Sequence, residues 1–153
     1  MKLPTNGFRR AMQGGDVTYG LWLGLPDASA AEIAAGAGFD WLLIDHEHSP
    51  LEISDILNLL RAVAPYPLAP IVRPVSDDPA LLKKLLDIGV LSFLLPMVDS
   101  AAQAEAIVRA LRYPPAGRRG VGADTLVLAR GSRELLARYR EPGPAGSPGS
   151  SGS

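Results

Sequence analysis

The sequence predicts an α/β fold built from parallel β/α units. Four short runs are apolar on both faces rather than at alternate positions, as expected for parallel strands covered on each side: residues 19–25, 41–45, 69–73 and 92–98. Between these runs, apolar residues recur at helical spacing. Four consecutive units leave two architectures open, an open doubly wound sheet and the first half of a closed barrel.

Helix start signals precede the intervening segments. A serine followed three residues later by Glu or Gln forms a capping box, and this pattern occurs at Ser29 with Glu32, Ser49 with Glu52 and Ser100 with Gln103. Pro50 and Pro79 follow the expected caps Ser49 and Asp78, and proline favours the first position of a helix. Gly89 is expected to end the helix that begins at Pro79.

Composition excludes several classes of function. The chain has 153 residues, a formal net charge of −1 and no cysteine. A near-zero charge argues against binding to nucleic acid or to a membrane surface, because both depend on a basic excess. Without cysteine there is no disulfide framework and no thiol nucleophile. No export signal and no membrane span is recognisable, so we expect a cytoplasmic protein.

The amino-acid composition of the sequence changes after Tyr113. Residues 114–122 have the composition of a loop, and residues 124–140 suit a basic helix. Residues 142–153 consist of Pro, Gly and Ser apart from Ala145, which is typical of a disordered tail. We therefore expect a domain of β/α units over residues 1–133, which the family resemblance described below implies to be a truncated β/α barrel, and a basic helix remnant with a disordered tail over residues 134–153.

The strongest candidate site follows the second predicted strand. The strand ends in the sequence Asp45-His46-Glu47-His48, which contains both histidines of the chain and two carboxylates. Reactive groups of parallel α/β proteins gather at the carboxyl ends of the strands. A carboxylate that holds one imidazole nitrogen prepares the ring as a general base. The alternatives are a solvent-facing turn and, less favoured because four adjacent residues rarely converge on one ion, a metal site.

The third predicted strand ends in Arg73, directly before a proline. Arg73 suits two roles equally, a structural ion pair with Asp45 or Glu47 and a fixed guanidinium that binds a carboxylate or an enolate oxygen. Trp22, on the first predicted strand, suits the core better than a ligand wall. The glycines of residues 117–122 match neither of the common phosphate-binding patterns, so they are interpreted as loop residues.

Taken together, these segments resemble the HpcH/HpaI aldolase family. The resemblance rests on motifs that occur in the same order: GLWLGL (20–25), AGAGFDWLLID (35–45), EH (47–48), IVRP (71–74), LPMV (95–98), RYPPAG (112–117) and RGVG (119–122). It covers residues 7–122 approximately. It implies a (β/α)₈ barrel and a class II, metal-dependent pyruvate aldolase that cleaves a 4-hydroxy-2-oxo acid reversibly to pyruvate and an aldehyde.

The resemblance also implies roles for individual residues. Asp45 and His48 correspond to the acid/base pair of the family, with His48 acting through water. Arg73 corresponds to the arginine that holds the oxo or enolate oxygen of pyruvate, and Trp22 to a residue of the pocket wall. Glu47 corresponds to a carboxylate near metal-bound water. His46 occupies a variable position of the motif and receives no role.

The sequence resembles only the amino-terminal half of the family. The expected cofactor is a divalent metal, Mg²⁺, Mn²⁺ or Co²⁺, but the family's metal-ligating Glu and Asp lie on later strands that have no counterpart here. Family members are commonly homo-oligomers, and the expected partner is a small oxo acid. We therefore expect an aldolase by family whose isolated chain is inactive. The alternative is a non-catalytic half barrel that pairs with another chain.

Overall fold

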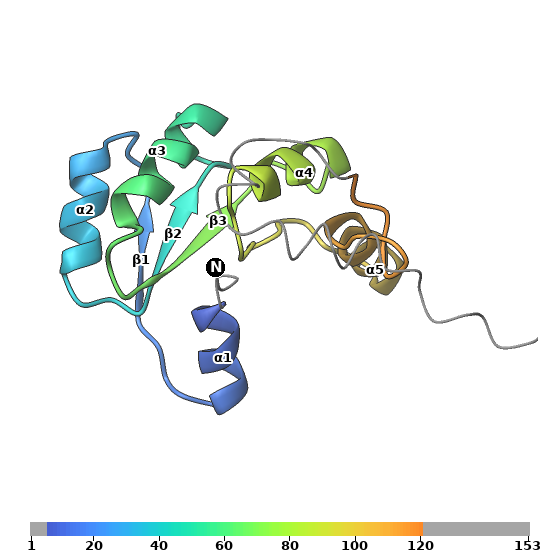
Figure 1. The fold of residues 1–153 in the computed structure, drawn as a ribbon, viewed down its shortest axis with the longest axis horizontal. Helices are drawn as coiled ribbons and strands as arrows, with labels where there is room; N and C mark the ends of the chain where they lie inside the picture. Colours follow the sequence, from blue (N-terminus) through green and yellow to red (C-terminus); the bar gives the residue numbers. More distant parts are fainter. Residues whose placement is uncertain (1–5, 121–153) are drawn as a thin grey trace, which may run out of the picture.

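The structure is a computed structural model that describes residues 6–120. Helices and strands alternate along most of this part of the chain (Figure 1): α1 (Gly7–Gly14), β1 (Gly20–Leu23), α2 (Ala28–Gly36), β2 (Trp41–Asp45), α3 (Ile53–Val63), β3 (Ala69–Arg73), α4 (Pro79–Asp87) and α5 (Ala101–Leu111). The basic helix expected within residues 124–140 and the tail expected to residue 153 lie outside the described residues. Among the described helices, none has the length and apolar character needed to span a membrane.

The three strands form one parallel sheet in the order β1-β2-β3. Trp22 pairs with Leu43 across β1 and β2, and Asp45 pairs with Arg73 across β2 and β3. Paired residues share a face of the sheet, and so do residues two positions apart on one strand. The register therefore places Trp22, Asp45 and Arg73 on the same face.

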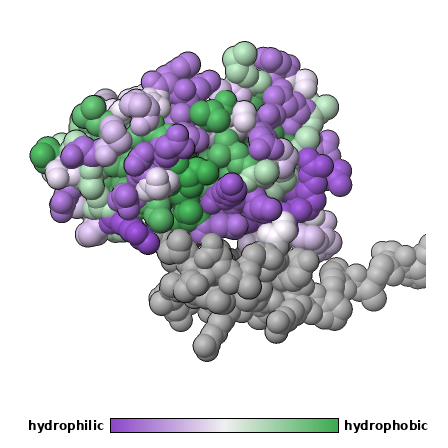
Figure 2. All heavy atoms as spheres, turned by 90° about the horizontal axis from the view of Figure 1, so that it is seen from above, coloured by the Kyte–Doolittle hydropathy of each residue, from purple (hydrophilic) through white to green (hydrophobic). Residues whose placement is uncertain are grey.

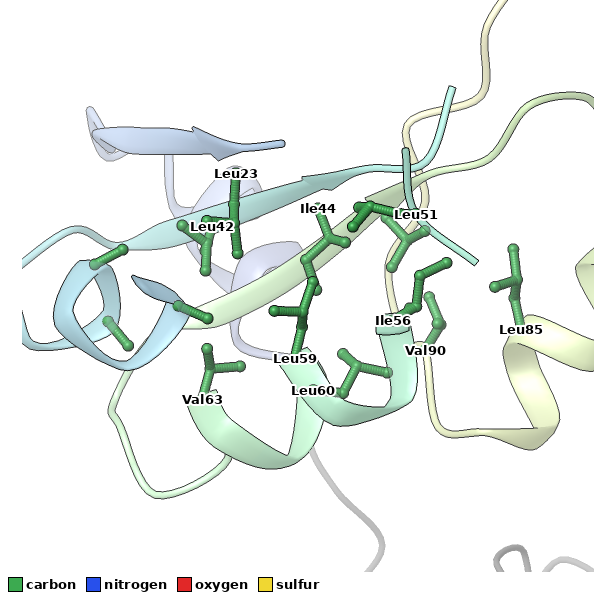
Figure 3. Packing of buried hydrophobic residues seen from close by; sticks show 14 residues of the cluster. Leu23, Leu42, Ile44, Leu51, Ile56, Leu59, Leu60, Val63, Leu85 and Val90 are labelled. Carbon is green, nitrogen blue, oxygen red and sulfur yellow. The ribbon is translucent and has the colours of Figure 1, made fainter. Parts of the chain in front are cut away.

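The opposite face of the sheet carries the hydrophobic core. Leu42 and Ile44 of β2 and Val72 of β3 are fully buried, and they belong to one cluster with residues of α3. Figure 3 shows the side chains of β2 directed toward Leu59 on α3. Because burial of each large aliphatic side chain contributes roughly 1.5–3 kcal/mol, this layer holds the strands firmly enough to fix the opposite face.

The fourth predicted strand, residues 92–98, forms only in part. Phe93 makes an isolated parallel bridge to Val72, and no strand extends beyond it in the described chain. Pro96 has no backbone N–H to donate to a ladder, and Met97 adopts a φ of 55°, in the left-handed region. The expectation of four full strands is wrong for this segment, because its backbone leaves the extended conformation at its carboxyl end.

None of the three predicted capping boxes forms in full. Asp27, not Ser29, caps α2 by accepting from the N–H of Ala30, and α3 begins after Glu52, which forms a capping box with Asp55. Local side-chain competition decides such caps, because any nearby Asp or Glu can satisfy the same N–H groups. The predicted caps Asp78 and Ser100 are confirmed for α4 and α5, but Gln103 accepts from the N–H of Asp99 rather than from that of Ser100.

Helix α1, which the periodicity of the sequence did not indicate, lies at the amino-terminal end of the strands (Figure 1). Phe8 packs edge-on against Trp41, the first residue of β2, with ring centroids 6.3 Å apart. The side chain of Asn6 donates to the carbonyl of Leu91 and to the hydroxyl of Ser92, at 3.0 and 2.9 Å. These contacts leave the carboxyl ends of the strands open.

Candidate active site

The candidate site lies at the carboxyl ends of β2 and β3. Asp45 and Arg73 are the last residues of these two strands and are paired in the sheet register. Glu47 and His48 follow β2 in the loop that leads to α3. The sheet thus brings together, at one edge, the charged residues that the sequence predicted from strand ends alone.

Arg73 and Asp45 form a two-pronged ion pair. The Nε and Nη2 atoms of Arg73 donate to Oδ1 and Oδ2 of Asp45 at 2.9 and 2.6 Å. Both side chains are largely buried, with 17% and 10% of their surface exposed. The hydrogen bond from Arg73 holds the pKa of Asp45 below its ordinary value, while the same bond raises the pKa of Arg73. The pair is therefore fully charged at neutral pH.

Glu47 lies between the guanidinium and the imidazole. Its Oε2 atom is 3.2 Å from Nε of Arg73 and 3.6 Å from Nε2 of His48. The second distance is that of an ion-pair contact rather than a hydrogen bond. The His48 side chain is 69% exposed, so the imidazole borders both the charged cluster and solvent.

Asp45 organises the loop rather than the imidazole. Its Oδ1 atom accepts from the backbone N–H groups of Glu47 and His48, each at 3.2 Å, in addition to the bond from Arg73. We expected Asp45 to hold the imidazole of His48. In the structure, Glu47 is instead the carboxylate beside the ring. The physical reason is that both oxygens of Asp45 already have donors.

Trp22 lies against the guanidinium. The Cζ atom of Arg73 is 4.5 Å from the centroid of the indole ring, a distance at which a cation is attracted to the face of an aromatic ring. The indole is half-exposed, so the expectation that Trp22 belongs to the core is wrong. It lies on the face of the sheet that carries the charged residues.

His46 stands apart from this cluster. Its backbone N–H donates to the carbonyl of Arg73 at 3.0 Å, which extends the pairing of β2 and β3 by one residue. Its ring Nδ1 is buried and has no hydrogen-bond partner in the part of the chain that the structure describes. No hydrogen bond or ion pair joins the His46 side chain to the guanidinium or to the carboxylates in residues 6–120.

A small residue that received no role in the sequence contributes to the site's shape. At Gly24, just after β1, an added Cβ would lie 2.5 Å from the hydroxyl oxygen of Ser49. Glycine therefore allows the loop after β2 to pack closely on the chain after β1. A glycine directly after a strand, on the side where the loops converge, was the available sequence signal.

The residues of the site do not fit a metal ion. No group of three or more His, Asp or Glu side chains suited to a metal occurs within residues 6–120. The two carboxylates of the site, Asp45 and Glu47, both face the guanidinium of Arg73. A cation placed between them would have to displace this permanently charged group.

Comparison with known proteins identifies the relatives of this chain. The family model for HpcH/HpaI aldolase/citrate lyase matches residues 18–131. A hydroxypyruvate/pyruvate aldolase of Pseudomonas aeruginosa is 58% identical over 140 residues, which are 91% of this chain and 51% of that protein. A 4-hydroxy-2-oxo-heptane-1,7-dioate aldolase of Escherichia coli is 53% identical over 128 residues, 84% of this chain and 48% of that protein.

Solved structures agree with the sequence relatives. A HpcH/HpaI aldolase/citrate lyase family protein from Burkholderia cenocepacia matches with a TM-score of 0.80 and 36% identity, over 88% of this chain and 56% of that one. The chain thus spans about half the length of the relatives it matches. The match confirms the fold class as parallel β/α units of the first half of a (β/α)₈ barrel. This chain belongs to the HpcH/HpaI aldolase/citrate lyase family.

Proposed function

We propose that this chain contributes the base and the oxo-acid-binding arginine of a pyruvate aldolase, which cleaves a 4-hydroxy-2-oxo acid reversibly to pyruvate and an aldehyde. One observation carries the proposal. An exposed imidazole and a fixed guanidinium meet around one carboxylate, at 3.6 and 3.2 Å, at the carboxyl ends of two parallel strands. The names of the relatives, hydroxypyruvate/pyruvate aldolase and 4-hydroxy-2-oxo-heptane-1,7-dioate aldolase, support the reaction class.

The reaction needs one base and one group that stabilises negative charge. The base removes the proton of the C4 hydroxyl, the C4–O electrons form the aldehyde carbonyl, and the C3–C4 bond breaks. The electron pair of the broken C3–C4 bond forms the C2–C3 double bond of the enolate, and negative charge collects on the C2 oxygen. Return of a proton to C3 completes pyruvate. We assign the base to His48, acting through water, and the stabilising group to Arg73.

Arg73 suits this task because it is fixed before the substrate arrives. Oδ1 and Oδ2 of Asp45 accept hydrogen bonds from Nε and Nη2 of Arg73, whereas Nη1 has no hydrogen-bond partner within residues 6–120. Nη1 is therefore the donor that we assign to an oxygen of the oxo acid. A donor that is already oriented needs no reorganisation when the charge develops.

The remaining residues support these two. Glu47 lies beside the imidazole and the guanidinium, and the family resemblance assigns it a place near metal-bound water. Trp22 lines the site next to Arg73.

The family is associated with a divalent metal ion, for which we propose Mg²⁺, Mn²⁺ or Co²⁺. The described residues do not by themselves fit such an ion. We also propose that the protein is a cytoplasmic homo-oligomer.

Exchange of the methyl protons of pyruvate for deuterium tests the base without an aldehyde partner. We do not expect this chain alone to cleave the oxo acid, but proton exchange needs only the base and Arg73. With Mn²⁺ or Mg²⁺ present, the wild-type chain is therefore expected to exchange these protons in D₂O, measured by proton NMR, and His48→Ala is expected to reduce the rate to that of the blank. His46→Ala is the matched control and is expected to keep the rate. Equal exchange rates in the wild type and His48→Ala would contradict the assignment of the base.

A non-catalytic role is the second candidate. Strand β1 is an edge of the sheet, and Val17, Tyr19 and Leu21 on or near it are exposed. Figure 2 also shows hydrophobic residues exposed on the molecular surface between hydrophilic ones. Such a surface suits pairing with another chain. No exchange above the blank, together with no metal bound at equilibrium, would favour this half-barrel role over catalysis by the chain alone.

A further inference from the structure

The hydrogen bonds of Arg73 to Asp45 hold one edge of its guanidinium. Nε and Nη2 donate to the two carboxylate oxygens at 2.9 and 2.6 Å, whereas Oε2 of Glu47 lies 3.2 Å from Nε as an ion-pair contact. Because the N–H bonds of a guanidinium lie in its plane, these hydrogen bonds restrain tilting out of the plane less than movement within it. A contact from outside the plane adds the remaining restraint.

The indole of Trp22 supplies that contact. Cζ of Arg73 lies over the indole ring, 4.5 Å from the ring centroid, and β1 holds the indole there through the pairing of Trp22 with Leu43. This contact limits movement of the guanidinium toward and away from the ring, which the hydrogen bonds to Asp45 restrain less. The two kinds of contact are therefore complementary.

We propose that Trp22 is a positioning residue, which holds the guanidinium of Arg73 so that its Nη1 edge faces the oxo acid. This inference rests on the proposed function for the identity of the ligand. Because the indole occupies one side of the cation, a ligand of Arg73 approaches from another side. The planar set of N–H donors suits a flat group, such as the 2-oxo acid or its enolate, whose oxygens lie in one plane.

The side-chain NMR signal of Arg73 reports this role directly. In the full chain labelled with ¹⁵N, the Nε–Hε signal is assigned from its loss in Arg73→Lys. Trp22→Leu is expected to move this signal downfield, because the shielding by the indole face is removed, and to make Hε exchange with water several-fold faster. Trp22→Phe is expected to restore part of both effects, since an aromatic face returns.

Two controls separate positioning from folding. Leu21→Ala changes the neighbouring residue of β1 and is expected to leave the Arg73 signal in place. The backbone amide spectrum of Trp22→Leu is expected to remain that of the folded protein, because the indole is half-exposed. An Arg73 signal that is the same in Trp22→Leu and in the wild type would overturn the inference.

Titration with pyruvate then distinguishes the inference from the proposed function. Binding followed at the Arg73 signal is expected to weaken about threefold to tenfold in Trp22→Leu, the range of one cation–π contact, and less in Trp22→Phe. Unchanged pyruvate affinity despite a displaced Arg73 signal would overturn the link to ligand orientation. A wild-type Arg73 signal that pyruvate does not perturb, but that Trp22→Leu displaces, supports positioning and contradicts the oxo-acid assignment.

Discussion

Two arginines in different regions of this chain share two kinds of contact, an ion pair with an aspartate and a cation–π contact with an aromatic ring. Arg73, at the end of β3, donates to Asp45 at 2.6 Å, and Arg119, after α5, donates to Asp87 at 2.7 Å. Each guanidinium also lies over an aromatic ring, with 4.5 and 4.6 Å between Cζ and the ring centroid. By residue type and distance alone, the two clusters are nearly alike.

Their surroundings differ. Arg73 has a second carboxylate, Glu47, and through it an imidazole at the carboxyl ends of the strands. Arg119 pairs with one carboxylate at the end of α4, and its Nε is buried without a hydrogen-bond partner in the described chain. The first cluster lies beside the imidazole that we propose as the base, whereas the second fastens a loop to a helix. We therefore assign ligand binding to Arg73 and a structural role to Arg119 from their locations on the fold, not from their contacts.

Removing Arg73 is expected to have the largest effect. In Arg73→Met, Asp45 keeps its burial but loses its charge partner, and breaking a buried pair in this way costs about 3 kcal/mol of unfolding free energy. The response of the protein to pyruvate is expected to disappear as well. Urea unfolding and a pyruvate titration measure the two effects, and a loss below about 1 kcal/mol would show that the pair contributes little.

Acid is expected to weaken the same cluster by a smaller amount, since it removes a charge but not a side chain. The pair with Arg73 lowers the pKa of Asp45 in the folded protein below its ordinary value of 3.8. Its contribution is thus complete above pH 4 to 5 and is lost as the pH falls through the folded pKa. Unfolding free energies between pH 6 and 3 are expected to fall less steeply in Asp45→Asn than in the wild type. Equal slopes would contradict a lowered pKa.

Removing Arg119 sharpens the comparison. Arg119→Met is expected to cost about 1 kcal/mol of stability, because one hydrogen-bonded ion pair is lost while a buried donor without a partner is also removed. Pyruvate exchange or binding is expected to stay at the wild-type level. A variant that unfolds normally but loses pyruvate binding would show that the second cluster belongs to the site.

The smallest effect is expected at the aromatic ring of the second cluster. Tyr113→Leu removes the ring under Arg119 but leaves the ion pair with Asp87, so the loss is about 0.5 kcal/mol. The matched change at the first cluster, Trp22→Leu, is expected to affect ligand binding more than stability. If the two variants lose equal stability and neither alters pyruvate binding, both rings are structural.

The site could be predicted in part because the fold class determines which ends of the strands lie together. Apolar runs on both faces predicted parallel strands, and parallel strands bring their last residues, here Asp45 and Arg73, to one edge. The contact of His48 with Glu47 could not be predicted in this way. It depends on how the loop N–H groups and the guanidinium share the oxygens of Asp45, which sequence spacing does not determine.

The fourth strand shows the same limit for the fold. Residues 92–98 carry the apolar pattern of the other three strands, yet only Phe93 forms a bridge. Pro96 has no N–H to donate and Met97 adopts a left-handed φ of 55°, so the backbone leaves the extended conformation before the end of the predicted strand. The caps at Asp27 and Glu52 were missed for a related reason, since several polar residues near each helix start compete for the same N–H groups.

One titration tests the central claim that Arg73 and His48 share a ligand. Pyruvate is added to the ¹⁵N-labelled chain, and the side-chain signals of both residues are followed in the same spectra. We predict that the two signals saturate with one dissociation constant and that neither responds in Arg73→Met. Movement of the His48 signal alone, or two clearly different dissociation constants, would contradict a common oxo-acid site.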